Sequence, residues 1–195
     1  NNEAYHGGGI GLMHGTLNLE DGKIINNTAL DKTCGGGVFV AYNSMFNMAG
    51  GTIAHNKAYN GAGIALGSSY NDAYINGAHP TLMMVGGIIS DNRARSNGGG
   101  IFIQKNCLAE IRQGSIINNH CEGLDHGFNY GGGGIYVNGG KESTFDNGVL
   151  HLYNVEIANN SSVFAGCPTS TTKVYLTDGA VIHDNQNPKV DIYAN

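Results

Sequence analysis

One short pattern recurs along the chain, and this internal repeat constrains the fold more than any other sequence feature. The pattern reads apolar-x-apolar-x-x-Gly-x-Ile-x-x-Asn-x-Ala, then a glycine cluster and a second apolar-x-apolar run, and it is clearest in residues 17–40, 46–66 and 82–103. Repeats of about 20–50 residues are typical of solenoids, in which each repeat stacks on the next. The recurring asparagines are Asn27, Asn56, Asn92, Asn119, Asn160 and Asn185.

The apolar residues within each repeat alternate with a period of two, which indicates short strands and not helix. Each repeat supplies roughly three short strands separated by glycine or asparagine bends. A chain that bends in this way and stacks on itself is a parallel β-helix, so we predict an all-β solenoid of about six rungs. Residues 1–195 are expected to form one domain, and because both ends fall in mid-repeat we expect an internal segment of a longer solenoid.

Two kinds of stacked column are expected inside this solenoid. The apolar residues that follow the glycine clusters should lie above one another about 4.8 Å apart. The recurring asparagines should form a hydrogen-bonded ladder inside one bend, and the glycines permit positive φ at the bend before the apolar strand. The apolar column comprises Ile10, Val38, Ile64, Ile101 and Ile135.

Extra residues are inserted at one position of the repeat, after the glycine-led strand, in segments 67–80, 104–108 and 138–148. Insertions at one repeat position emerge on one side of a solenoid, which is often the binding face. We therefore expect binding by Tyr70, Asp72, Tyr74, Lys105, Lys141 and Glu142. The acid–base candidates, if the chain is an enzyme, are Asp72, Lys105, Glu142 and Asp146. The tyrosines that could stack on sugar rings if exposed are Tyr70, Tyr74, Tyr130, Tyr136 and Tyr153.

The glycine-led strand and the asparagine-containing segment, in this order, resemble the repeats of right-handed parallel β-helix proteins. More narrowly, they resemble the repeats of polymorphic outer membrane proteins and adhesin-like surface proteins of bacteria and archaea. The resemblance implies a right-handed solenoid in a secreted or cell-surface protein that engages glycans or host surfaces. The wider pectate-lyase-like superfamily also includes enzymes that cleave polysaccharides. The chain departs from the pattern at Val155, which stands in the glycine place, and in the irregular stretch 163–173.

Enzymes of this superfamily need converging polar groups. A glycosidase needs two carboxylates across a cleft, and a lyase needs acidic residues around calcium together with a Lys or Arg base. No acidic position recurs at one register of the repeat, although Glu122, Asp125 and His126 form a second polar group in a bend. We expect the chain not to be an enzyme, and a polysaccharide lyase or glycoside hydrolase is the alternative.

No metal or other cofactor is expected, and calcium is retained only with the lyase alternative. His55 and Asp91 precede ladder asparagines on neighbouring repeats, but a metal site needs two or three converging ligands and this is one pair. The calcium β-roll signature is absent, because no Asp follows a glycine cluster at the required spacing.

Charge and cysteine content narrow the class of partner further. The net charge is −5 with ten scattered Lys and Arg, so a basic surface for nucleic acid is not expected. The sequence lacks an apolar run of the roughly 20 residues that span a bilayer, so membrane insertion is not expected either. Without a Cys-x-x-Cys pair zinc is disfavoured, while disulfides and buried thiols both stay open. The cysteines are Cys34, Cys107, Cys121 and Cys167.

Together, these features favour a segment of a secreted or cell-surface repeat protein that acts in adhesion, with a glycan or host-surface ligand bound on the side of the insertions. A structural stalk that binds nothing is a second alternative beside the polysaccharide-cleaving enzyme. Exposed sheet edges at the ends of the solenoid also predict end-to-end self-association.

Overall fold

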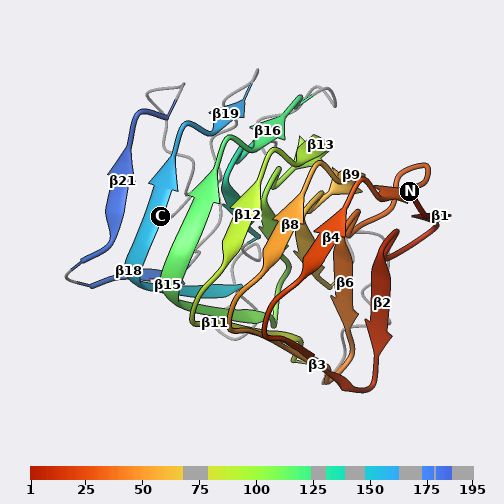
Figure 1. Ribbon diagram of the computed structural model, residues 1–195, viewed down its shortest axis with the longest axis horizontal. Helices are drawn as coiled ribbons and strands as arrows, with labels where there is room; N and C mark the ends of the chain where they lie inside the picture. Colours follow the sequence, from red (N-terminus) through yellow and green to blue (C-terminus); the bar gives the residue numbers. More distant parts are fainter. Residues whose placement is uncertain (68–78, 124–130, 139–147, 163–172, 178, 186–195) are drawn as a thin grey trace.

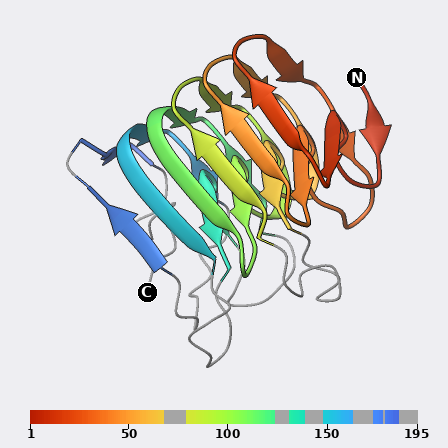
Figure 2. The same ribbon diagram turned by 90° about the horizontal axis from the view of Figure 1, so that it is seen from below.

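The protein is an all-β molecule built from three sheets of parallel strands, as seen in a computed structural model (Figure 1). The structure describes residues 1–67, 79–123, 131–138, 148–162, 173–177 and 179–185. Within these ranges no residue is helical, and no helix is long and apolar enough to cross a membrane. Figure 2 shows the turns of the chain following one another side by side along the molecule.

Sheets A and B each collect one short strand from successive turns of the chain. Sheet A contains β1 (Glu3–Ala4), β5 (Thr28–Ala29), β9 (Lys57–Asn60), β13 (Arg93–Asn97), β16 (His120–Cys121) and β19 (Ser161–Ser162). Sheet B contains β2 (Ile10–Met13), β6 (Val38–Ala41), β10 (Ile64–Leu66), β14 (Ile101–Ile103) and β17 (Ile135–Val137).

Sheet C is the largest sheet and has two halves that meet at a bend. Its first half contains β3 (Thr16–Leu19), β7 (Met45–Met48), β11 (Thr81–Met84) and β20 (Lys173–Leu176). Its second half contains β4 (Lys23–Ile25), β8 (Thr52–Ala54), β12 (Ile88–Ser90) and β21 (Val181–His183). Two long strands, β15 (Leu108–Ile117) and β18 (Val149–Ala158), run through both halves.

The prediction of stacked parallel strands is confirmed, whereas the expected number of strands per repeat is not. A complete early turn has four strands instead of three, because sheet C is interrupted at glycines with positive φ such as Gly22 and Gly51. In β15 and β18 the interruption disappears, since Gly114 and Val155 pair with each other in register. The three sheets are open, and their arrangement is compatible with a β-helix solenoid.

The core consists of side chains that point inward from the three sheets and stack between turns. The predicted column is in register, with Ile10 opposite Val38, then Ile64, Ile101 and Ile135. Its last four members are fully buried. A second column of isoleucines in sheet C faces it, comprising Ile24, Ile53, Ile89, Ile116 and Ile157.

Hydrogen bonds join the recurring asparagines in one direction, from each turn to the next. The backbone N–H and the side-chain Nδ2 of Asn56 both donate to Oδ1 of Asn92, each at 3.0 Å. The second Nδ2 hydrogen of Asn56 is directed to the carbonyl of Ile24 on the previous turn, at 2.9 Å. The same pattern is repeated from Asn27 to Asn185 with donor–acceptor distances of 2.9–3.1 Å. The side-chain amides therefore form hydrogen bonds both within the ladder and to backbone carbonyls of the isoleucine column.

The glycine clusters serve two physical purposes. The first glycine adopts positive φ, as predicted, for example 57° at Gly61 and 61° at Gly98. The third glycine faces the ladder, which the sequence did not reveal. A Cβ on Gly63 would lie 2.5 Å from the carbonyl oxygen of Gly100 and 3.0 Å from Nδ2 of Asn92. A side chain at this position would therefore push the stacked turns apart.

We expect Gly63→Ala to lower the free energy of unfolding by about 1–3 kcal/mol, the usual range for overpacking a core. The reason is that the nearest obstacle is backbone of the next turn, which cannot rotate away. Chemical denaturation measures the change. The matched control is Gly11→Ala on the exposed side of β2, where the nearest atom to a Cβ is 3.6 Å away. Equal losses from both variants would contradict the packing argument.

Removal of one asparagine side chain from the ladder should also lower the free energy of unfolding. Asn92→Ala takes away the acceptor of two Asn56 donors and one donor to Asn119, all in buried surroundings. A buried polar group without its partner costs about 1–3 kcal/mol, so we expect a loss of at least about 2 kcal/mol by denaturation. Asn47→Ala is the comparison, because its 2.8 Å bond to Asn18 is exposed to water, and its cost should stay below about 1 kcal/mol.

Candidate functional site

The surface with the best claim to function is the corner between sheets B and C, where the insertions leave the solenoid. We call this the insertion corner and define it by segments 14–15, 42–44, 67–80, 104–107 and 138–148. Of the predicted site residues, the structure describes Lys105 alone, and it lies half-buried at this corner. The other predicted residues lie outside the described residues: Tyr70, Asp72, Tyr74, Lys141, Glu142 and Asp146.

The three insertions begin and end at equivalent positions. They follow Leu66, Ile103 and Val137, which are paired in register across β10, β14 and β17. They are followed by residues that again pair with one another, at the start of β11, β15 and β18. The insertion points are therefore stacked on consecutive turns, about 4.8 Å apart.

Described side chains at the insertion corner offer hydrogen-bonding groups to solvent. The backbone N–H of the exposed His79 donates to Oδ1 of Asn43 at 2.9 Å, and its ring Nδ1 lies 3.2 Å from the carbonyl oxygen of Asn106. One turn earlier, the rings of His14 and Tyr42 stack with centroids 4.4 Å apart. These groups suit a ligand rich in hydroxyls.

A buried polar pair supports the base of two insertions. Gln104 is 4% exposed, and its side-chain oxygen accepts from the backbone N–H of Lys105 at 3.0 Å and from Nδ2 of Asn138. The amide thus links neighbouring turns directly below the inserted residues. No carboxylate occurs among the described residues of the insertion corner, so acid–base chemistry there would depend on residues outside them.

The second predicted polar group is only partly described. Asp125 and His126 lie outside the described residues. Glu122 forms an ion pair with Arg93, whose Nε lies 2.5 Å from a carboxylate oxygen. The Arg93 side chain is largely exposed, and such pairs contribute at most about 1 kcal/mol. Burial, together with the charge of Arg93, lowers the pKa of neighbouring His120. The Glu122 carboxylate is therefore engaged in a surface ion pair with Arg93.

Two of the candidate tyrosines, Tyr136 and Tyr153, are described. Tyr136 is 6% exposed and packs in a cluster with Phe39 and Phe102, so its ring covers apolar surface and does not meet the condition of exposure for stacking on a sugar. Its ring stacks on Phe102 with centroids 5.6 Å apart. Tyr153 is half-buried, and the guanidinium of Arg112 lies 5.4 Å from its ring centroid. Neither ring is open on both faces.

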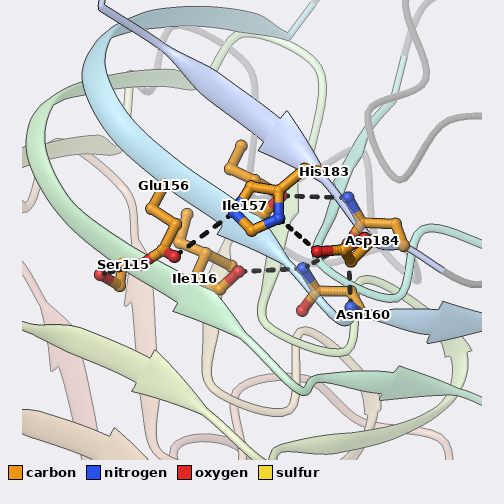
Figure 3. A network of polar contacts seen from close by, with 8 residues as sticks. Ser115, Ile116, Glu156, Ile157, Asn160, His183 and Asp184 are labelled. Atoms are coloured by element: carbon orange, nitrogen blue, oxygen red, sulfur yellow. Dashed lines mark hydrogen bonds and ion pairs between the residues drawn. The ribbon is translucent and has the colours of Figure 1, made fainter.

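A network that the sequence analysis missed lies on the outer face of β15, β18 and β21 (Figure 3). His183 stands between two carboxylates, with Nδ1 2.7 Å from Asp184 and Nε2 3.5 Å from Glu156. Glu156 also accepts a hydrogen bond from the hydroxyl of Ser115 at 3.0 Å. The hydroxyl donates to Glu156 and not to the imidazole, so the geometry is not that of a nucleophile and its base. Only the register of the strands, which brings Ser115 beside Glu156, could have revealed it.

The described thiols and metal-binding groups show no reactive site. Cys34, Cys107 and Cys121 are buried, and Cys167 lies outside the described residues. Burial raises the pKa of the Cys107 thiol to about 12, so it stays protonated at neutral pH. Within the described part of the chain, no group of three or more His, Cys, Asp or Glu side chains converges to hold a metal ion.

Comparison with known proteins adds no further constraint on this site. The chain matches no family model, no curated protein and no solved structure.

The surroundings of His183 and His6 predict that these two histidines titrate at different pH values. Hydrogen bonding to Asp184, reinforced by Glu156, raises the pKa of His183, whereas burial lowers the pKa of His6. We expect NMR to show His183 titrating above 6.5 and His6 below it. Because folding raises the pKa of His183, the protonated imidazole stabilises the folded state below about pH 6.5. This contribution disappears as the pH rises through the pKa of His183 in the folded state.

Glu156→Gln tests the origin of this shift. The neutral amide keeps the shape of the side chain but removes its charge, so the His183 titration should move to lower pH while the His6 titration stays in place. An unchanged His183 titration would show that Glu156 does not contribute.

Proposed function

We propose that the chain is a segment of a secreted or cell-surface protein with a right-handed parallel β-helix of about six rungs, which acts in adhesion. In this proposal the insertions emerge on one side, and a glycan or another host- or cell-surface ligand binds there. The observation that carries the proposal is the register of the insertion points, which stack on consecutive turns at one corner.

The chemistry of the insertion corner supports a glycan as the ligand. Imidazole, amide, phenol and ammonium groups are all present among His79, Asn43, Tyr42 and Lys105. Such groups can donate to and accept from the many hydroxyls of a sugar chain. The stacked turns place these different polar groups at regular intervals along one corner, which suits an extended polymer. Tyr70, Asp72, Tyr74, Lys141 and Glu142 would contribute from the insertions.

A stalk that binds no ligand is the second candidate. The uninterrupted amide ladder from Asn27 to Asn185 favours it, because it stiffens the molecule along its length without providing any binding group. A polysaccharide lyase or hydrolase, with or without calcium, is an alternative that the binding test distinguishes. It would require Asp72, Lys105, Glu142 and Asp146 to converge.

Binding to an immobilised panel of acidic and neutral polysaccharides tests the proposal. We expect saturable binding to at least one polysaccharide, and about tenfold weaker binding for Lys105→Ala and Tyr70→Ala, equivalent to about 1.4 kcal/mol each. The matched control is Lys57→Ala, which removes an exposed lysine from β9 in sheet A, away from the insertions. Its binding should equal that of the unchanged chain.

The same panel separates the alternatives. No binding to any polysaccharide would favour the stalk. Formation of unsaturated products or new reducing ends would favour the enzyme, and dependence on calcium would identify a lyase. Binding that is lost equally with Lys57→Ala and Lys105→Ala would argue against a site at the insertion corner.

A further inference from the structure

Two columns of side chains point outward from the second half of sheet C on five successive turns. They alternate along the strands with the inward-pointing isoleucines, so they form the outer face of β4, β8, β12, β15 and β18, which lie side by side in Figure 1. We call this surface the outer C face. One column comprises Lys23, Thr52, Ile88, Ser115 and Glu156, in register from turn to turn, and the other comprises Ile25, Ala54, Ser90, Ile117 and Ala158.

The centre of the outer C face is uncharged and exposes apolar side chains. Ile88 on the middle strand is 42% exposed, and Val85, which precedes it across the bend, is 43% exposed. The six described members of the two columns on β8, β12 and β15 include no charged residue. Charges stand at the margins instead, with Lys23 two turns before Ile88 and Glu156 two turns after it. An apolar centre inside a polar rim is the usual anatomy of a protein–protein interface.

The positions of the two charges make this face complementary to a second copy of itself. A two-fold rotation about an axis that lies along β12, parallel to the strands, reverses the order of the turns in the second copy. Lys23 of one copy then lies opposite Glu156 of the other, and the same contact occurs twice. Ile88 lies at the axis, opposite the Ile88 of the second copy.

The sizes of the side chains match under the same rotation. Ile25 is 36% exposed and lies opposite Ala158, which is 1% exposed. Ile117 is half-buried and lies opposite Ala54, which is 4% exposed. In both pairs a projecting isoleucine therefore meets a recessed alanine, as close packing of two sheets face to face requires.

The outer C face is also large enough for a stable contact. Five strands about 4.8 Å apart, each with about eight residues at 3.3 Å as in segment 83–90, cover roughly 600 Å². Two such faces bury about 1,200 Å², which is the lower limit for a standard interface. The surface faces sideways, across the direction in which the turns stack, so additional turns at either end would leave it open.

We propose that the outer C face binds the same face of a second copy of this chain, with the two-fold axis along β12. Rotation about the other in-plane axis, along the stacking direction, would place each turn opposite the same turn of the partner. Lys23 would then lie near Lys23, and Glu156 near Glu156, so the charges select the axis along β12. Because each copy contributes the same surface, the contact closes and association stops at the dimer.

Ile88→Lys tests the centre of this contact. Sedimentation velocity of the unchanged 195-residue chain should show a monomer and a dimer that grows no further as the concentration rises. In Ile88→Lys two ammonium groups face each other at the axis, so we expect the dimer dissociation constant to rise at least about tenfold.

The matched control is Met13→Lys, which changes an apolar residue of 55% exposure on β2 in sheet B and should leave the dimer unchanged. Circular dichroism and thermal melting establish that each variant is folded. A monomeric unchanged chain, equal weakening by both variants, or species that keep growing with concentration would each overturn the proposal.

Reversal of the two marginal charges tests the orientation of the copies. Lys23→Glu places two carboxylates opposite each other, and Glu156→Lys places two ammonium groups opposite each other, so each variant alone should dimerise at least about tenfold more weakly. An equimolar mixture of the two variants restores opposite charges in both contacts and should form a heterodimer about as stable as the unchanged dimer. A mixture that associates no better than its components would show that Lys23 does not lie opposite Glu156 and would overturn the proposed arrangement.

Discussion

The directional hydrogen bonds between stacked asparagines are the interaction on which the rest of this structure depends. The amides from Asn27 to Asn160 are buried, so their donors and acceptors must be satisfied by neighbouring turns and not by water. That requirement sets the register, because Asn92 can reach Asn56, Asn119 and the carbonyl of Ile53 only when the turns lie directly above one another. Insertions of any length are tolerated elsewhere, since they leave this register unchanged.

The same constraint explains why glycine occupies the third position of the glycine clusters. Gly63 and its equivalents lie across a narrow interior from the ladder, where a Cβ would collide with the backbone of the next turn. Among the described residues, the interior thus consists of stacked amides and glycines in close contact with apolar side chains such as Ile64, Leu82 and Met84. The composition varies from turn to turn on the outside of the stacked sheets, so a binding surface is expected there.

The outer surfaces differ in what they can bind. Sheet B carries an aromatic cluster on its outer face, with Phe39, Phe102 and Tyr136 buried. The exposed charges on the other surfaces include ion pairs, such as Arg93 with Glu122 at sheet A and His183 with Asp184. The insertion corner differs from both, because its exposed imidazole and amide groups are not held in ion pairs with carboxylates among the described residues. This difference is the basis of the proposal that the insertion corner binds a ligand of many hydroxyls.

The sequence by itself determined the strand period, the ladder asparagines and the column from Ile10 to Ile135, because a repeated local pattern must repeat its local structure. It also located the insertions. Only the tertiary structure decided that Tyr136 is buried, that Ser115 lies beside Glu156, and that Gly63 faces the ladder. These facts depend on which residues of different turns meet, and the turns differ in length by the size of their insertions. Contacts within a repeat can be read from one sequence, whereas contacts between repeats depend on how the turns are stacked.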